Sequence, residues 1–130
     1  MKIDQKYGFV LLRVALSLVF LWFGINQLYS PSSWLGFVPS FLGAFAAPKL
    51  FVLLNGCVEV ILGMLLLFGF YVRWVSLILG IHLIGISFSL GYSAIAVRDF
   101  GLSMATISLF FFEPDKFCLE LIDKKDSEEK

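Results

Sequence analysis

Apolar residues gather in four segments of the chain, with polar residues clustered between them. Two segments, residues 8–28 and 49–69, hold about 21 residues each, and as helices each would span about 30 Å of hydrocarbon. A third covers residues 72–90, and a fourth ends at Phe112. The apolar run after Asp99 is too short to cross a bilayer of ordinary thickness, so the fourth helix either begins before Arg98 or lies in a locally thinned bilayer, and we favour a start near Ile95. The pattern predicts an all-α fold: a polytopic membrane protein with a four-transmembrane-helix bundle.

The connections between these segments differ in character. Between the first two, Ser30 suits a helix N-cap, Pro31 suits the first helical position, and Pro39 would end the helix. We therefore expect a short interfacial helix there, with Pro48 in the first turn of the second long helix. Only the stretch GFYVR separates the second and third segments, so these two helices should be antiparallel neighbours.

Composition supports a membrane protein and narrows the function classes. Hydrophobic residues make up 59% of the chain and the mean hydropathy is +0.91, outside the range of soluble globular proteins. We expect a transmembrane domain over residues 1–114 and a charged cytoplasmic tail over residues 115–130. The stretch KFCLELI should lie along the membrane surface, and the final DKKDSEEK should be solvated and frayed. No basic patch supports nucleic-acid binding. Cys57 and Cys118 are too few for a disulfide framework.

Lysine and arginine residues lie unevenly on the two sides of the predicted bundle. The opposite side carries only Lys49 and Arg98, whereas the side of the N-terminus collects Lys2, Lys6, Arg73, Lys116, Lys124, Lys125 and Lys130. The positive-inside rule then places both termini in the cytoplasm, with the bundle integral to the plasma or inner membrane.

One carboxylate, Glu59, lies in the middle of the second apolar segment. A charge at that depth costs about 2.5 to 3.5 kcal/mol on insertion scales, so such residues usually face a bundle interior and have a partner. Glu59 is ten residues from Lys49, and His82 is ten residues from Val72 on the next helix, so both should lie near the midplane. We predict a buried polar network of Arg13, Asn55, Glu59 and His82, with Arg13 or His82 as partner of Glu59. Interhelical attachment, a proton relay and a ligand contact all remain open as its role.

A second group of polar residues should gather at the outer interface, near the ends of the first and third helices. A quinone head could meet hydrogen-bond donors there while its tail stays in lipid, although an ordinary interfacial belt is the alternative. The group consists of Asn26, Gln27, Tyr29, Tyr92, Arg98 and Asp99. No zinc set is expected, because His82 is the single histidine and the two cysteines are far apart.

Three stretches carry a family resemblance: LRVALSLVFLWFGINQLYSP, VEVILGMLLLFGFYVRW and AVRDFGL. In order and spacing they resemble the DoxX family (DoxX/DoxD-like) of small four-helix integral membrane proteins. Some members are associated with redox systems, including a quinone-linked thiosulfate oxidoreductase subunit and partners of detoxifying enzymes. A glycine-rich turn expected after the last helix is replaced by FFEPDKF. The resemblance picks out Arg13, Gly24, Glu59, Gly63, Gly69, Arg73, Arg98 and Asp99.

Three functions follow as hypotheses. The first is an accessory, anchoring or assembly subunit for a redox-linked partner, since no complete catalytic constellation is visible and the tail could contact another protein. The second is a quinone-interacting oxidoreductase subunit, in which quinone would be the cofactor. The third is a proton or small-solute carrier along the polar seam around Glu59. The bilayer is the expected environment, and both enzymatic activity and a homo-oligomer are left open.

Overall fold

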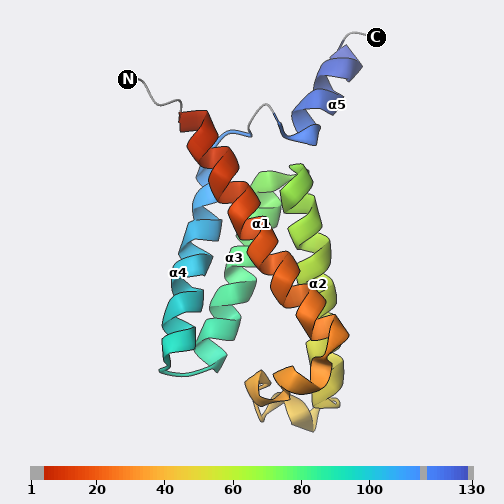
Figure 1. Cartoon of the computed structure of the whole chain (residues 1–130), viewed down its shortest axis with the longest axis vertical. Coiled ribbons are helices and arrows are strands. Elements are labelled where there is room, and N and C mark those ends of the chain that lie inside the picture. The colour runs from red at the N-terminus through yellow and green to blue at the C-terminus, as the bar shows by residue number, and fades with distance from the viewer. Residues whose placement is uncertain (1–4, 115–116, 129–130) are drawn as a thin grey trace.

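A computed structural model describes residues 5–114 and 117–128, which form helices and connecting turns without a strand. Figure 1 shows four long helices side by side and a short one beyond them. The elements are α1 (Gln5–Tyr29), η1 (Pro31–Phe37), η2 (Leu42–Ala44), α2 (Pro48–Phe68), α3 (Val72–Ser89), α4 (Ala94–Ser108), η3 (Leu109–Phe111) and α5 (Leu119–Glu128).

Four helices are long and apolar enough to cross a membrane, as the hydrophobic pattern predicted. They are α1, α2, α3 and the continuous stretch of α4 with η3, Ala94–Phe111. The expected start of the fourth helix near Ile95 is correct within one residue, because Ser93 caps it: the Ser93 hydroxyl accepts a hydrogen bond from the Ala96 N–H at 3.1 Å. The all-α membrane fold is confirmed.

The short helix between α1 and α2 is present, but it is a 3-10 helix rather than an α-helix. Pro31 occupies its first turn as expected, and Ser30 is the N-cap residue without a capping hydrogen bond. The Ser30 hydroxyl instead lies 2.9 Å from the Ser33 hydroxyl. The 3-10 helix covers seven residues, which is longer than most helices of this kind. Pro48 begins α2 as predicted.

The bundle consists of two helical hairpins, α1 with α2 and α3 with α4. Within the first hairpin the backbones touch: a Cβ atom added to Gly24 would lie 2.9 Å from the Gly56 carbonyl oxygen, and one added to Gly56 would lie 3.0 Å from that of Gly24. Such close approach is possible only for residues without a side chain. Contact between the hairpins is much less extensive than contact within each of them.

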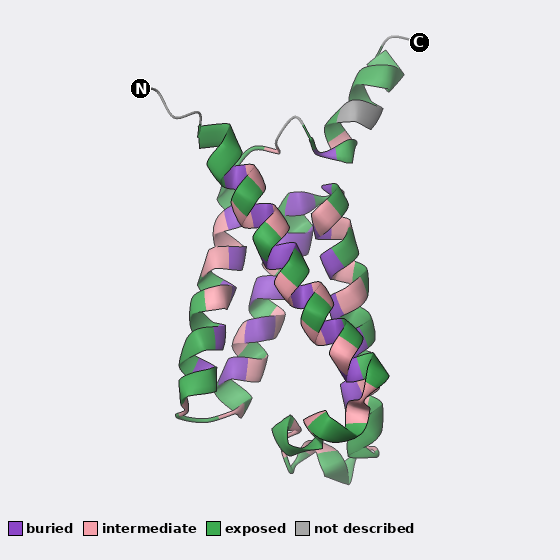
Figure 2. Ribbon diagram, in the orientation of Figure 1, coloured by how far each residue is buried: buried purple, intermediate pink, exposed green. Residues whose placement is uncertain are grey.

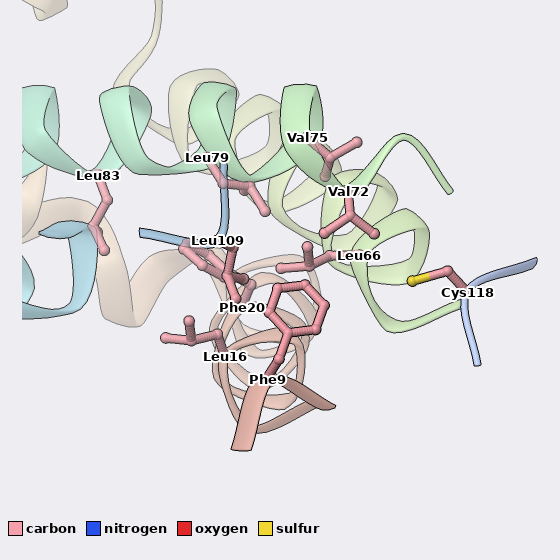
Figure 3. Packing of buried hydrophobic residues seen from close by; sticks show 10 residues of the cluster. All are labelled: Phe9, Leu16, Phe20, Leu66, Val72, Val75, Leu79, Leu83, Leu109 and Cys118. Atoms are coloured by element: carbon pink, nitrogen blue, oxygen red, sulfur yellow. The ribbon is translucent and has the colours of Figure 1, made fainter. Parts of the chain in front are cut away.

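Buried apolar side chains concentrate at one end of the bundle, where α1 begins and α2 ends (Figures 1 and 3). We call this the closed end. Leu66 of α2, Leu79 of α3 and Leu109 of η3 meet there and are fully buried. Figure 2 shows the complementary pattern on the outside of the helices, where exposed residues predominate. Exposed apolar residues such as Leu11 and Ile61 are what a lipid-facing surface requires.

The α2–α3 turn at the closed end also receives the C-terminal segment. Gly69 ends α2 in a left-handed conformation (φ 77°), and the N–H of Phe70 donates to the Leu65 carbonyl at 2.9 Å, a common helix-ending pattern. Cys118 is buried so closely on Gly69 that an added Cβ would lie 2.6 Å from its Cα. The segment is therefore anchored at Cys118 and helical over Leu119–Glu128. The described part of the stretch expected to be frayed, residues 123–128, belongs to this helix, and a Glu120–Lys124 spacing of four also favours it.

Candidate functional site

The end of the bundle opposite the closed end contains a cavity, and we call it the open end. The cavity has a volume of about 870 Å³ and lies between the two hairpins, with η1 and the residues after it beside α1. All four spanning helices contribute to its wall. Small-molecule sites in proteins occupy about 300–1,000 Å³ and are mostly apolar with a few placed polar groups, and this cavity has that character.

One wall of the cavity carries a hydrogen-bonded set of three side chains, which we call the amide–carboxylate cluster: Gln27, Asn55 and Glu59. The Gln27 amide donates to Glu59 Oε2 at 3.0 Å, and the Asn55 amide donates to Glu59 Oε1 at 3.1 Å and to Gln27 Oε1 at 2.8 Å. Glu59 is only 3% exposed. The contact between Gly24 and Gly56 brings α1 and α2 close enough for Gln27 to reach across.

The facing wall carries His82 on α3 and an ion pair on α4. Gly85 and Ser89 follow His82 at helical spacing on one face of α3, and all three line the cavity. The Nε2 atom of His82 is buried and has no hydrogen-bond partner within the described residues. A buried polar atom of this kind in a folded protein normally pairs with a ligand or water.

The ion pair joins Arg98 and Asp99. The Arg98 Nε donates to Asp99 Oδ1 at 2.9 Å and its Nη2 lies 2.8 Å from the same oxygen. Asp99 is buried, whereas the Arg98 side chain is half exposed. The Arg98 guanidinium also lies 5.4 Å from the centre of the Phe23 ring, so it reaches from α4 to α1 across the cavity.

Aromatic rings form a continuous rim along the α1 and η1 side of the cavity. Trp22 and Phe23 have ring centres 5.0 Å apart, Phe23 and Trp34 5.6 Å, and Trp34 and Phe37 5.5 Å. We call these four residues the aromatic rim. The interfacial position of Trp34 and Phe37 was predictable, but their contact with Trp22 and Phe23 depends on η1 folding back over α1.

Arg13 does not join Glu59, and that predicted pairing is wrong. Its Nη1 atom donates to the Leu66 carbonyl at 2.7 Å and to the Leu67 carbonyl at 2.5 Å. Both carbonyls belong to the last turn of α2, where the helix dipole favours a cation. The antiparallel arrangement places the start of α1 beside the end of α2, and Arg13 is therefore one turn or more from the middle of α2, where Glu59 lies.

His82 shares the cavity with Glu59 but makes no hydrogen bond to it. The predicted network of Arg13, Asn55, Glu59 and His82 is thus divided: Asn55 contacts Glu59, His82 faces it across the cavity, and Arg13 lies at the closed end. Sequence reasoning missed Gln27 as a partner of Glu59. The available signal was the spacing of three between Gly24 and Gln27, which puts Gln27 on the face of α1 that contacts α2.

The predicted outer-interface group is also divided. Asn26, Arg98 and Asp99 line the cavity, and Asn26 donates to the Trp22 carbonyl at 2.7 Å. Gln27 turns inward to Glu59. Tyr29 and Tyr92 are almost completely exposed and do not line the cavity, because Tyr29 ends α1 and Tyr92 follows the left-handed Gly91 in the α3–α4 turn.

Four spanning helices in two hairpins, enclosing a partly polar cavity, define a small polytopic α-helical membrane protein. A family model described as DoxX matches residues 8–92, well over half of the chain, and the chain belongs to the DoxX family. The match covers α1 to the α3–α4 turn and so includes the amide–carboxylate cluster and His82, but not Arg98 and Asp99. Comparison with curated proteins and with solved structures gives no match.

Proposed function

We propose that this DoxX protein binds a small amphipathic molecule in the cavity between its hairpins. The ligand would place a polar head against the buried polar side chains and an apolar body against the aromatic rim. The observation that carries the proposal is the cavity of about 870 Å³, which brings together Glu59 from one hairpin and His82 from the other. His82 supports it further, because this residue lines the cavity and its Nε2 atom has no hydrogen-bond partner within the described residues.

The position of the cavity favours uptake from the bilayer. Trp22 of α1 and Ile81 of α3 line it, and each is 58% exposed on the outside of a spanning helix. The flanks between the hairpins are therefore at membrane depth, where an amphipathic molecule concentrates. A quinone belongs to this class of ligand, so the quinone-interacting function expected from the sequence becomes one case of the proposal.

The other two functional hypotheses draw less support from the geometry. A carrier needs a passage through the bundle, whereas Phe20, Leu66 and Leu79 fill the bundle beyond the cavity on the closed side. This arrangement favours binding over passage. An accessory or assembly role for a redox-linked partner stays a prediction, because it depends on the partner rather than on the cavity.

Tryptophan emission tests the proposal, because two of the three tryptophans line the cavity. Trp74 lies against Phe110 at the closed end and serves as internal control. The Trp74→Phe protein retains Trp22 and Trp34, and the Trp22→Phe/Trp34→Phe protein retains Trp74 alone. In nanodiscs, we expect decylubiquinone or 4-phenylbutylamine to cause a saturable change in emission only in the first protein. Equal and unsaturable changes in both proteins would indicate partition into lipid and overturn the proposal.

A pair of glycines provides a matched control for the cavity itself. A Cβ atom added to Gly85 or to Gly101 would meet nothing within 4 Å, but only Gly85 lines the cavity. Gly85→Leu should therefore fill part of the cavity and weaken ligand binding at least tenfold. Gly101→Leu makes the same chemical change on a helix exterior and should leave binding unchanged. Equal affinity in the two variants would contradict a ligand in this cavity.

A further inference from the structure

The two carboxylates that line the cavity have hydrogen-bond acceptor capacity left unused. The two amide hydrogens of Asn55 are taken by Gln27 and Glu59. Each Glu59 oxygen accepts one hydrogen bond, although a carboxylate oxygen can accept two. Asp99 receives both Arg98 contacts on Oδ1, which leaves Oδ2 available. A ligand head that donates several hydrogen bonds therefore suits these two carboxylates better than one that only accepts them.

The charges around the cavity point in the same direction. By formal charge, Glu59 and Asp99 are negative, Arg98 is positive and His82 is neutral. Because Arg98 is held by Asp99, the Glu59 carboxylate is left with neutral amide partners and no cation among the described residues. A carboxylate at membrane depth is costly without a cationic partner, and a positively charged ligand would lower that cost.

The aromatic rim is compatible with a cation as well as with an apolar body. Aromatic faces attract ammonium and guanidinium groups, and Arg98 already uses the Phe23 face in this way. Trp22, Trp34 and Phe37 supply further ring surface beside the cavity. The rim therefore adds to the attraction of the Glu59 carboxylate for a positive head.

We propose that the ligand of the cavity is a lipophilic amine bound in its protonated form. Its ammonium group donates hydrogen bonds to Glu59 and lies between the amide–carboxylate cluster and His82. Its hydrocarbon or aromatic body packs on the aromatic rim and extends toward the bilayer. The inference rests on the proposed function, since it names the ligand class of that same cavity. It replaces the neutral head of a quinone with a positively charged donor.

A matched pair of probes measures the contribution of the charge. 4-Phenylbutylamine and 4-phenylbutanol share one apolar body and differ in the head group. Affinities are measured by Trp22 and Trp34 emission in nanodiscs of zwitterionic phosphatidylcholine. We expect the amine to bind at least about tenfold more tightly than the alcohol, as a charge-assisted hydrogen bond provides. Equal affinity of the two probes at a saturable site would overturn the amine proposal and leave the proposed function standing.

Two charge-removing variants locate the effect. Glu59→Gln should reduce the amine-to-alcohol affinity ratio to about one, because the amide carries no charge to attract the ammonium, and saturable alcohol binding in this variant shows that the cavity is still formed. Glu113→Gln makes the same change at an exposed position near the end of η3 and should keep the native ratio. A native ratio in Glu59→Gln would overturn the assignment of Glu59 as the ammonium partner. Absence of binding by either probe in the native protein would overturn the proposed function and this inference together.

Discussion

The two ends of the bundle accommodate buried charge in different ways. At the closed end, Arg13 is 2% exposed, and it donates to the carbonyls that terminate α2 amid tightly packed leucines. At the open end, Glu59 is equally buried but faces a cavity and bonds to two neutral amides. The Arg13 guanidinium satisfies carbonyls at the end of α2. The Glu59 carboxylate can still accept hydrogen bonds from another molecule.

This difference separates a structural use of polar residues from a functional one. Polar residues that hydrogen-bond to a neighbouring helix hold membrane helices together, and each such hydrogen bond contributes modestly to stability. Ser103 and Thr106 are satisfied within α4 instead, because each hydroxyl donates to a carbonyl of its own helix. Residues that line a cavity and still have unused hydrogen-bonding capacity contribute little to helix association but can bind a ligand. The closed end should therefore dominate stability and the open end should dominate ligand recognition.

The largest loss of stability is expected from Arg13→Ala. The change removes the charged donor of two carbonyls and the packing of a buried side chain, which together should cost about 4 kcal/mol. Arg13→Lys should lose less, because an ammonium can still reach one carbonyl. Chemical unfolding in detergent measures both. A neutral effect of Arg13→Ala would break the comparison, since the closed end would then not depend on its buried charge.

Truncation of an apolar side chain should also be more costly at the closed end. Leu79 is fully buried among Leu66 and Leu109, so Leu79→Ala should lower the free energy of unfolding by about 3 kcal/mol. Ile95 borders the cavity and is 38% exposed, and Ile95→Ala should cost less than about 1 kcal/mol because no new void forms in a filled core. The same unfolding experiment compares them. Equal losses would mean that both ends are packed alike.

A smaller effect distinguishes the partners of Glu59. A double-mutant cycle of Glu59→Ala with Gln27→Ala should show a coupling energy of about 1 kcal/mol, because the two side chains bond directly. The cycle with Arg13→Ala should be additive within about 0.5 kcal/mol, because Arg13 bonds elsewhere. Coupling to Arg13 in place of Gln27 would restore the pairing that the sequence suggested and contradict the separation of the two ends.

The fold was largely predictable because membrane thickness constrains it. The apolar run before Gly69 must be helical to satisfy its backbone in lipid, and its length determines that it spans. Pro31, Pro48 and Ser93 then mark local boundaries that depend only on neighbouring residues. The 3-10 form of η1 was not predictable, because the preference between two helix types in so short a segment depends on its contacts with α1.

The sequence predicted most residues of the site but not which of them form hydrogen bonds with each other. Depth along a helix follows from counting residues, and it predicted that Glu59 and His82 lie at a similar level on neighbouring helices; both line the cavity. The rotation of one helix against another does not follow from counting. It depends on the contact between Gly24 and Gly56, which turns Gln27 toward Glu59. The cavity itself is a property of the angle between hairpins, for which the sequence has no local signal.

The smallest predicted effect compares two serine caps on the open side of the molecule. Ser93 bonds the Ala96 N–H at the start of α4, whereas Ser30 precedes η1 without a capping bond. Ser93→Ala should therefore cost about 1 kcal/mol, the usual value of an N-cap. Ser30→Ala loses only an exposed contact with Ser33 and should be nearly neutral. Ser93 does not line the cavity, and Ser30 lines it with a neutral hydroxyl, so neither variant should alter the ratio of amine to alcohol affinity. If Ser30→Ala proved the more destabilising, the stability of η1 would depend on this hydroxyl. The structure of the open end would then be determined by η1 rather than by the two hairpins.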